Sequence, residues 1–186
     1  FQIPGRVWIR QLAIKDQFAF VNSSGRIFIL DTYDTDDIVL VAQVEVQGNI
    51  TDLLVDGEFL YACCGWWTDE IYLGNLSIID ISHPQRPVLV GSYVPDDIFY
   101  RSMAKIDDHI FIAAEKSGVR MIDVSNPTDP EEVGFYNCHA DNVIANDSLI
   151  YCNGMWGEEL FILREGDPQF VSDNNMNELI SPVPLW

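Results

Sequence analysis

The chain has 186 residues, of which 48% are hydrophobic and 12% aromatic, a globular composition with enough apolar side chains to bury a core. Its formal net charge is −19, from 29 acidic and 10 basic residues, and a field of this sign repels nucleic-acid phosphates and anionic lipid headgroups. No apolar run reaches the roughly 18–20 residues that span a bilayer. We therefore expect no nucleic-acid partner and no membrane insertion.

One short pattern recurs along the chain. A hydrophobic run that ends in Asp occurs at 27–31, 76–80 and 119–123, and a degraded copy that ends in Arg occurs at 160–164. The last positions of these runs are 49 (31 to 80), 43 (80 to 123) and 41 (123 to 164) residues apart. Self-similarity at a period of roughly 40 to 50 residues is typical of propellers and solenoids.

Each copy divides into four short predicted strands. In the second copy we expect them at 50–55, 59–63, 76–81 and 87–94. Asp56-Gly57 joins the first two and is a strong hairpin signal. The matching turns are predicted at Lys15-Asp16, Asp107-Asp108 and Asn146-Asp147. The third strand of each copy is almost continuously apolar, which favours a strand covered on both faces.

An Asp follows the third predicted strand in three copies, at Asp31, Asp80 and Asp123. In two of them a Ser and a Pro come next. Asp and Ser side chains bond to nearby backbone amides in turns, and Pro fixes the corner. These residues are therefore predicted to be structural, and no catalytic residue is assigned.

Four such units predict an all-β fold, a β-propeller of four-stranded antiparallel blades with about four repeats in this chain. The propeller is expected to span residues 1–172, with blades at approximately 6–48, 49–97, 98–138 and 139–172, and a C-terminal tail is expected at 173–186. The sequence leaves two alternatives open, a complete small ring or part of a larger propeller with repeats missing before residue 1.

The turns at Ile79-Asp80-Ile81-Ser82-His83-Pro84 and Ile122-Asp123-Val124-Ser125-Asn126-Pro127 carry a family resemblance. Each is followed by an apolar strand that ends in Gly-Ser-Tyr (91–93) or Gly-Phe-Tyr (134–136). Together they resemble the LVIVD repeat family, over about residues 1–165. The resemblance implies a propeller, often in secreted or surface proteins of bacteria and archaea, and it supplies no catalytic motif. The fourth copy departs from the pattern, with Arg164-Glu165-Gly166-Asp167-Pro168 at the turn.

The connection between the second and third predicted strands differs most between copies. It is three residues long at 22–24 and 115–117, but it is predicted to form a 12-residue loop at 64–75 and a smaller one at 154–158. Insertions of this kind commonly map to a binding face, and exposed aromatic side chains anchor protein partners. The predicted partner-binding residues are Trp66, Trp67, Tyr72 and Trp156. The alternative is a loop that plugs the ring with its own Trp side chains.

Candidate metal ligands are few. Asp34, Asp36 and Asp37 lie in an acidic run whose oxygens suit calcium, and His139 stands beside Cys138 and near Asp141. The glycine and the distal glutamate of an EF-hand loop are absent, and the histidine lacks a second pair of ligands. We therefore expect a solvated turn and no cofactor, with calcium as the alternative.

The cysteines and the glycosylation signals indicate in which cellular compartment the protein is found. Cys138 and Cys152 flank a predicted hairpin turn and are candidates for a disulfide. Asn-x-Ser/Thr sequences are more frequent than chance pairing of these residue types predicts, and all fall in or beside predicted turns. The glycosylation candidates are Asn22, Asn49, Asn75 and Asn146. These features predict an extracytoplasmic protein, either secreted or at the cell surface.

The expected function is that of a non-catalytic extracytoplasmic β-propeller, acting as a protein-interaction or surface scaffold. Contact with a protein partner, or self-association, is predicted through the face that carries the Trp-rich loop. One alternative is a hydrolytic or redox enzyme with its site at the mouth of the propeller channel, for which Cys63, Cys64 and His139 are candidates. Another is an accessory propeller of an extracellular filament or electron-transfer assembly.

Overall fold

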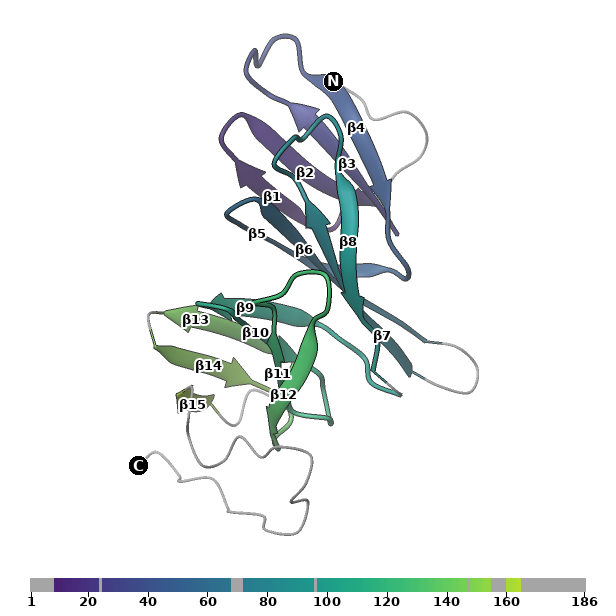
Figure 1. Cartoon of the computed structure of the whole chain (residues 1–186). Coiled ribbons are helices and arrows are strands. Elements are labelled where there is room, and N and C mark those ends of the chain that lie inside the picture. Colours follow the sequence, from purple (N-terminus) through teal and green to yellow (C-terminus); the bar gives the residue numbers. More distant parts are fainter. Residues whose placement is uncertain are drawn as a thin grey trace. The chain divides into compact units, whose positions relative to one another are not determined.

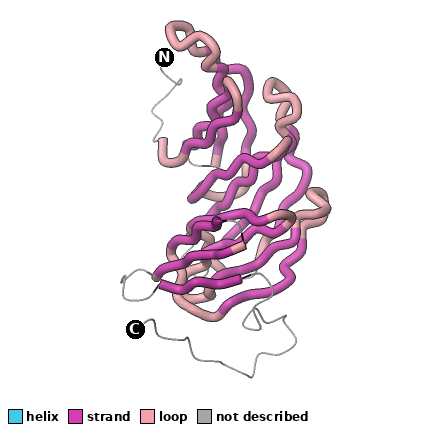
Figure 2. The backbone as a smooth tube through the Cα atoms, turned by 90° about the vertical axis from the view of Figure 1, so that its left-hand side faces the viewer, coloured by secondary structure: helices cyan, strands magenta, loops and turns pink. Residues whose placement is uncertain are grey.

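A computed structural model describes residues 9–23, 25–67, 72–95, 97–146, 148–154 and 160–164 of the chain. Within these ranges every regular element is a β-strand, as Figure 2 shows, so the predicted all-β class is confirmed. The strands are β1 (Leu12–Lys15), β2 (Phe18–Ser23), β3 (Arg26–Asp31), β4 (Val39–Glu45), β5 (Ile50–Asp56), β6 (Phe59–Trp67), β7 (Tyr72–Asp80), β8 (Val88–Tyr93), β9 (Ser102–Ile106), β10 (His109–Ala113), β11 (Val119–Asp123), β12 (Glu131–Tyr136), β13 (Asn142–Asn146), β14 (Leu149–Asn153) and β15 (Leu160–Arg164).

The strands form four antiparallel sheets in which chain neighbours are also sheet neighbours (Figure 1). We name them blade 1 (β1–β4), blade 2 (β5–β8), blade 3 (β9–β12) and blade 4 (β13–β15). The predicted fourth strand of blade 4 and the predicted tail lie outside the described residues. The chain divides into two compact units, residues 1–100 with 127–129, and residues 101–126 with 130–186. The first unit thus holds blades 1 and 2, and the second holds blades 3 and 4.

In blades 1 to 3 the first hairpin turns through a residue with positive φ. Asp16 has φ 52°, Gly57 has φ 55° and Asp107 has φ 45°, conformations that Gly and Asp tolerate better than most residues. In blade 3 the turn is Asp107-Asp108, as predicted. In blades 1, 2 and 4 the prediction was wrong by one residue, because Lys15 still pairs with Phe18, Asp56 with Phe59 and Asn146 with Leu149.

The repeated Asp closes a turn, as its sequence context indicates. One carboxylate oxygen of Asp80 accepts a hydrogen bond of 2.8 Å from the amide of Ser82, and Asp123 accepts one of 2.8 Å from Ser125. The next residue in the chain, Ile81 or Val124, donates its amide to the carbonyl of the first-hairpin turn in the same blade. The Asp therefore holds the end of the third strand against the first hairpin, which is a structural role.

A β-bulge interrupts the pairing of the third and fourth strands in blades 1 to 3. The register shifts between Ile29 and Leu30, between Ile78 and Ile79, and between Met121 and Ile122. These three points occupy the same position in the repeat. Because a bulge adds local twist and bends its strand, the same distortion is built into each of these sheets.

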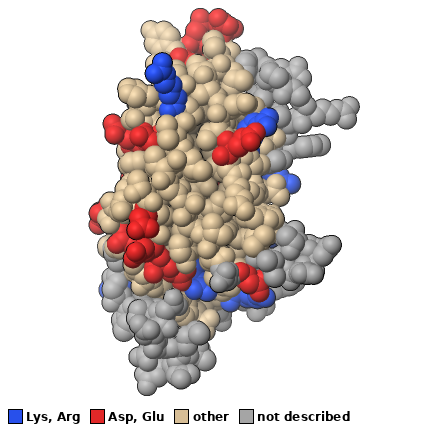
Figure 3. Space-filling model, turned by 45° about the vertical axis from the view of Figure 1, so that its right-hand side comes forward, with Lys and Arg blue, Asp and Glu red and all other residues tan. Residues whose placement is uncertain are grey.

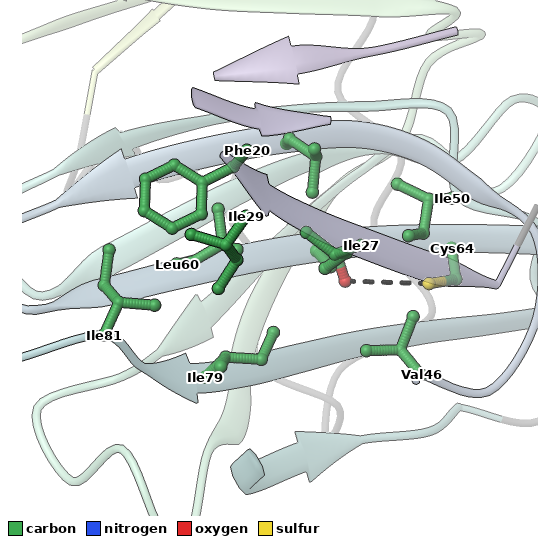
Figure 4. Close-up of a cluster of buried hydrophobic side chains, with 11 residues drawn as sticks. Phe20, Ile27, Ile29, Val46, Ile50, Leu60, Cys64, Ile79 and Ile81 are labelled. Atoms are coloured by element: carbon green, nitrogen blue, oxygen red, sulfur yellow. Dashed lines mark hydrogen bonds between the residues drawn. The ribbon is translucent and has the colours of Figure 1, made fainter. Parts of the chain in front are cut away.

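The core of the first unit lies between its two blades. Figure 4 shows Phe20, Ile27 and Ile29 of blade 1 beside Leu60 and Ile79 of blade 2. All five side chains are fully buried. A separate small cluster of Val21, Phe28 and Leu30 lies on the other face of blade 1. In the second unit the main cluster likewise joins blade 3 to blade 4. In blade 1 the third strand is therefore apolar because both of its faces carry packed side chains.

Candidate functional site

The enlarged connection of blade 2 is a β-hairpin rather than a loop. The predicted loop at 64–75 was wrong over most of its length, because β6 continues to Trp67 and β7 already starts at Tyr72. Cys64 pairs with Asn75 and Trp67 pairs with Tyr72, so the ladder continues to the described end of both strands. We call residues 64–67 with 72–75 the hairpin arm. Its tip, residues 68–71, lies outside the described residues.

Two paired glycines at the base of the arm allow a neighbouring segment to cross it closely. Gly65 pairs with Gly74, and a Cβ atom would lie 2.6 Å from the carbonyl oxygen of Tyr100 at the first and 2.6 Å from that of Ile98 at the second. The hydroxyl of Thr51 lies 3.0 Å from the Tyr100 carbonyl oxygen, and the Tyr100 side chain is fully buried. The base of the arm is therefore fixed by packing against the chain segment that follows blade 2.

Trp66 belongs to the core rather than to an exposed contact surface. Its half-buried side chain packs against the hydrophobic cluster between blades 1 and 2. Gly48 has φ +98°, and a Cβ atom there would come within 2.2 Å of the Trp66 ring. Trp66 thus packs between two blades, and plugging of the ring by Trp side chains stays a prediction. Trp67 and Tyr72 lie at the far end of the arm, their side chains outside the description, and Trp156 lies outside the described residues altogether.

The two adjacent thiols of blade 2 do not fit a redox site. Cys63 and Cys64 are fully buried. Burial raises the pKa of Cys64 to about 12, and burial together with the neighbouring Cys64 raises the pKa of Cys63 well above its ordinary value. Both groups are therefore protonated at neutral pH, and the nucleophilic thiolate is not populated.

An ionic cluster in the second unit was not predicted. Arg101 places its Nε atom 2.9 Å from Oδ1 of Asp141 and 2.6 Å from Oε1 of Glu115. His139 adds its Nδ1 atom, 3.5 Å from Oδ2 of Asp141. Glu115 has φ 51° and exchanges backbone hydrogen bonds with Ala140, which holds it in this unusual conformation beside β13. We call Arg101, Glu115, His139 and Asp141 the ionic cluster.

The ionic cluster brings a histidine and two carboxylates together, which is what the hydrolytic alternative requires. The carboxylates of Glu115 and Asp141, however, are both paired with the guanidinium of Arg101. Charge-assisted pairs of this kind hold carboxylates in place. The arrangement therefore favours a structural role. One signal was available in the sequence, because Arg101 and Asp141 occupy the same repeat position in consecutive blades.

Neutral amides lie near this place in the first unit, where Gln11 is the register equivalent of Ser102, the residue after Arg101. Asn22 is completely buried, and its Oδ1 atom accepts a hydrogen bond of 2.7 Å from the amide of Gln11. Its Nδ2 atom donates to the carbonyl of Ile50 in blade 2 at 3.1 Å, and Gln11 donates to the carbonyl of Thr51 at 2.8 Å. We call Gln11 and Asn22 the amide bridge between blades 1 and 2.

Two of the four predicted glycosylation sites are buried. The Asn22 side chain forms the amide bridge, and Asn75, which is 2% exposed, donates to the hydroxyl of Ser77 and the carbonyl of Gln47. Neither amide is accessible in the folded chain, so the prediction is wrong for these two. Asn49 and Asn146 are exposed, and glycosylation there stays a prediction.

The acidic run of blade 1 binds its own backbone. Asp34 accepts hydrogen bonds from the amides of Asp36, at 3.0 Å to the side chain, and Asp37, at 3.1 Å to the carbonyl. Across the ranges that the structure covers, no three His, Cys, Asp or Glu side chains gather in a way that could hold a metal ion. Asp34, Asp36, Asp37 and His139 therefore receive no support as metal ligands.

The disulfide candidates do lie together. Cys152 is buried in the core of the second unit and Cys138 packs against the same cluster. The two are free thiols in this structure, and a hydrogen bond between them, together with burial, raises the pKa of Cys152 far above its ordinary range. The disulfide itself stays a prediction.

Comparison with known proteins identifies two segments of the chain as copies of a known repeat. The family model described as LVIVD repeat matches residues 47–94 and 103–138. Both segments are LVIVD repeats. These matches cover blade 2 and most of blade 3, and they confirm the resemblance seen in the Asp-Ser-Pro turns. The search among curated proteins finds no match. No helix in the described part of the chain is long and apolar enough to cross a membrane.

Two solved structures of computationally designed proteins resemble this chain in fold. The designed Ika4 protein is 11% identical, with a TM-score of 0.66, over 88% of this chain and 95% of that one. The designed Ika8 protein is 12% identical, with a TM-score of 0.63, over 84% of this chain and 46% of that one. At such identities the likeness shows the fold alone. The chain thus corresponds to about half the length of the Ika8 chain.

Proposed function

We propose that this LVIVD-repeat chain is a non-catalytic propeller scaffold that binds a protein partner through the outer end of the hairpin arm. The observation that carries the proposal is that blade 2 continues its two central strands, nine residues each, beyond the five or six residues of their counterparts in the other blades. If residues 64–75 served only to connect two strands, β6 and β7 would not need to stay paired as far as Trp67 and Tyr72.

The bracing of the arm supports this role. Gly65 and Gly74 accept the segment that ends at Tyr100, and Trp66 fixes one strand against the core. A contact element that is already ordered loses less conformational entropy on binding than a mobile loop does. Trp67 and Tyr72 form the pair at the outer end, and both residue types are enriched among the residues that dominate binding energy.

The charge of the chain indicates the partner's chemistry. The net charge is −19, and Figure 3 shows acidic side chains in several separate groups on the face drawn. An acidic protein associates faster with a cationic surface, and this effect weakens as salt is added. We therefore expect a protein partner with a basic surface around an aromatic-binding pocket.

The test compares two positions of the arm. The Trp67→Ala, Tyr72→Ala double variant is expected to lose a partner that the natural chain retains from the extracytoplasmic fraction of its source cells, with an unchanged unfolding midpoint. Trp66→Ala is the matched comparison and is expected to lower the unfolding midpoint, because Trp66 packs on the core. Equal retention by the double variant and the natural chain would contradict the proposal.

The extracytoplasmic location is part of the same proposal. It is supported by exposure of the Asn-x-Ser/Thr asparagines Asn49 and Asn146. Peptide mass analysis of the protein from its source is expected to find glycans at these two positions and none at the buried Asn22 and Asn75. A glycan-free protein recovered from the cytoplasm would contradict it.

A further inference from the structure

The cores of the two units carry different residues at one pair of repeat positions. In the first unit this pair is Val46, which follows β4, and Ala62 on β6, and both belong to the main core. The strand registers place Cys138, which follows β12, and Cys152 on β14 at the equivalent positions of the second unit. Both cysteines take part in the core of that unit. Packing at this place therefore requires no cysteine, since Val and Ala suffice in the first unit.

The two thiols of the second unit lie next to each other. A hydrogen bond joins Cys138 to Cys152. A disulfide bond needs sulfur atoms about 2 Å apart, so thiols that are already hydrogen bonded have little distance to close. The backbone that follows Cys138 is fixed beside β14, because Asp141 donates its amide to the carbonyl of Asn153 at 2.8 Å. Ala140 exchanges backbone hydrogen bonds with the connection between β10 and β11, which fixes the same segment from blade 3.

The two thiols differ in accessibility. Cys138 is half-buried, whereas Cys152 is 1% exposed. The hydrogen bond with Cys138, together with burial, raises the pKa of Cys152 far above its ordinary range, so Cys152 is protonated at neutral pH. The part of this effect that comes from Cys138 is lost once the Cys138 sulfur carries another group. Cys138 is therefore the thiol that reacts first, and Cys152 is the one that follows.

We propose that Cys138 and Cys152 form a reversible disulfide, a redox-controlled staple between the segment leading into blade 4 and the middle strand of that blade. The oxidant is a low-molecular-mass disulfide such as oxidised glutathione. The Cys138 thiolate attacks one sulfur atom of the oxidant, which forms a mixed disulfide and releases one thiol. Cys152 then loses its proton, and its sulfur attacks the Cys138 sulfur and releases the second thiol. Two protein thiols are thereby oxidised, and one oxidant disulfide is reduced to two thiols.

The staple encloses the stretch from 138 to 152, which contains β13 and the first hairpin of blade 4 (Figure 1). A crosslink of this kind stabilises a fold chiefly because it restricts the unfolded chain. Disulfides persist in oxidising compartments and are opened in reducing ones, so the staple is closed outside the cytoplasm and open inside it. This agrees with the proposed extracytoplasmic location but does not depend on it, because the reaction is a property of the purified chain.

The experiment incubates the purified chain with oxidised glutathione, blocks the remaining thiols after denaturation and maps the cysteine peptides by mass spectrometry. The expected product links Cys138 to Cys152. Cys63 and Cys64 are expected to be recovered as blocked thiols, since both are fully buried. The oxidised chain is expected to unfold at a higher temperature than the reduced chain, and a phosphine reductant is expected to reverse this shift.

Two variants carry the residues of the first unit at the proposed site. Cys152→Ala is expected to accumulate a mixed disulfide of Cys138 with glutathione, because the second thiol is missing. Cys138→Val is expected to gain no glutathione, because Cys152 is buried. Both variants are expected to lose the rise in unfolding midpoint on oxidation. Cys63→Ala is the matched control and is expected to keep it.

Unlinked Cys138 and Cys152 in the oxidised natural chain would overturn the proposal, and so would a mixed disulfide on Cys138 that never passes to Cys152. A linked pair with an unchanged unfolding midpoint would overturn the stabilising role. A midpoint shift that persists in Cys138→Val would show that another group causes it. The peptide map is made on the natural chain, so its result stands even where a variant fails to fold. The hairpin arm lies in the other unit, and loss of partner binding there leaves this result unaffected.

Discussion

Blades 1 and 2 are joined near the start of their first strands by neutral amides, whereas blades 3 and 4 also carry an ion pair at the neighbouring repeat position. In the first unit, Asn22 and Gln11 bond to backbone carbonyls of blade 2. In the second unit, Ser102, the register equivalent of Gln11, bonds to Asn142 and Val143 of blade 4, and Arg101, one residue earlier, pairs with Asp141. The apolar packing behind these groups is the same in both units. The repeat therefore requires the apolar contact between blades, and the polar groups beside it are free to differ.

The largest expected effect tests whether the two cores are equivalent. Phe20 and Phe111 occupy the same repeat position, one in each unit, and both are completely buried. Replacing either with Ala is expected to lower the free energy of unfolding by about 3–5 kcal/mol, because a large cavity is left in a packed core. Urea denaturation of both variants measures this.

The equivalent residue in blade 4 supplies the control for that comparison. Tyr151 is only half-buried, so Tyr151→Ala is expected to cost clearly less than either phenylalanine variant. If Phe20→Ala and Phe111→Ala differed by several kcal/mol, the two blade contacts would not be equivalent.

The amide bridge is expected to come next in size. Asn22→Ala leaves the amide of Gln11 and the carbonyl of Ile50 without their buried partner, which costs about 1–3 kcal/mol. The loss is expected to be independent of salt because no charge is removed. Thermal unfolding at low and high salt measures it, with the exposed Asn49→Ala as the control. A loss of stability that falls as salt rises would contradict the neutral role.

The ionic cluster is expected to respond in the opposite way to salt. Arg101→Met removes the cation between Glu115 and Asp141, and for a partly exposed group the expected loss is about 1 kcal/mol. The loss is expected to shrink as salt rises, because salt screens both the lost attraction and the remaining repulsion. Arg26→Met, which breaks a more exposed pair with Glu45, is the control and is expected to cost less. A larger effect for Arg26 than for Arg101 would reverse this ranking.

The smallest expected effect concerns the repeated Asp, for which the two units are alike. Hydrogen bonds from the Ser82 hydroxyl and amide lower the pKa of Asp80, and those from Ser125 lower the pKa of Asp123. Each ionised carboxylate therefore stabilises the fold above the unfolded pKa of about 3.9, and this stabilisation is lost as the pH falls through the lower folded pKa.

Denaturation between pH 7 and pH 2 measures this effect. Asp80→Asn and Asp123→Asn are each expected to be slightly less stable than the natural chain at pH 7, with the difference closing at pH 2. A difference that grows at acid pH would mean that the carboxyl groups are not held in their ionised form.

Much of the fold could be predicted from the sequence because it repeats. The Asp-Ser-Pro turn and the apolar third strand are local patterns, and both are seen as expected in blades 2 and 3. The hairpin arm was missed because Gly65 and Gly74 suggest a loop when read along the chain. Their purpose is visible only beside the segment that ends at Tyr100, which packs against the paired glycines.

The polar sites were harder to predict because their partners are distant in the chain. Asn22 and Asn75 match a glycosylation sequence, and only burial shows that their amides are structural. In the ionic cluster, Arg101 pairs with Glu115, which lies between β10 and β11 of blade 3. It also pairs with Asp141, which immediately precedes β13 of blade 4. Aligning the repeats would have placed Arg101 beside Asp141, although not the conformation of Glu115.

The bulge shared by blades 1 to 3 has a consequence for motion. Because it interrupts the ladder at the same point in each sheet, β4, β8 and β12 are each attached in two short stretches instead of one long one. One stretch can open while the other stays paired, and local opening of this kind exposes amides without global unfolding. We therefore expect each outer strand to open in two steps and to exchange its amide hydrogens before the inner strands do.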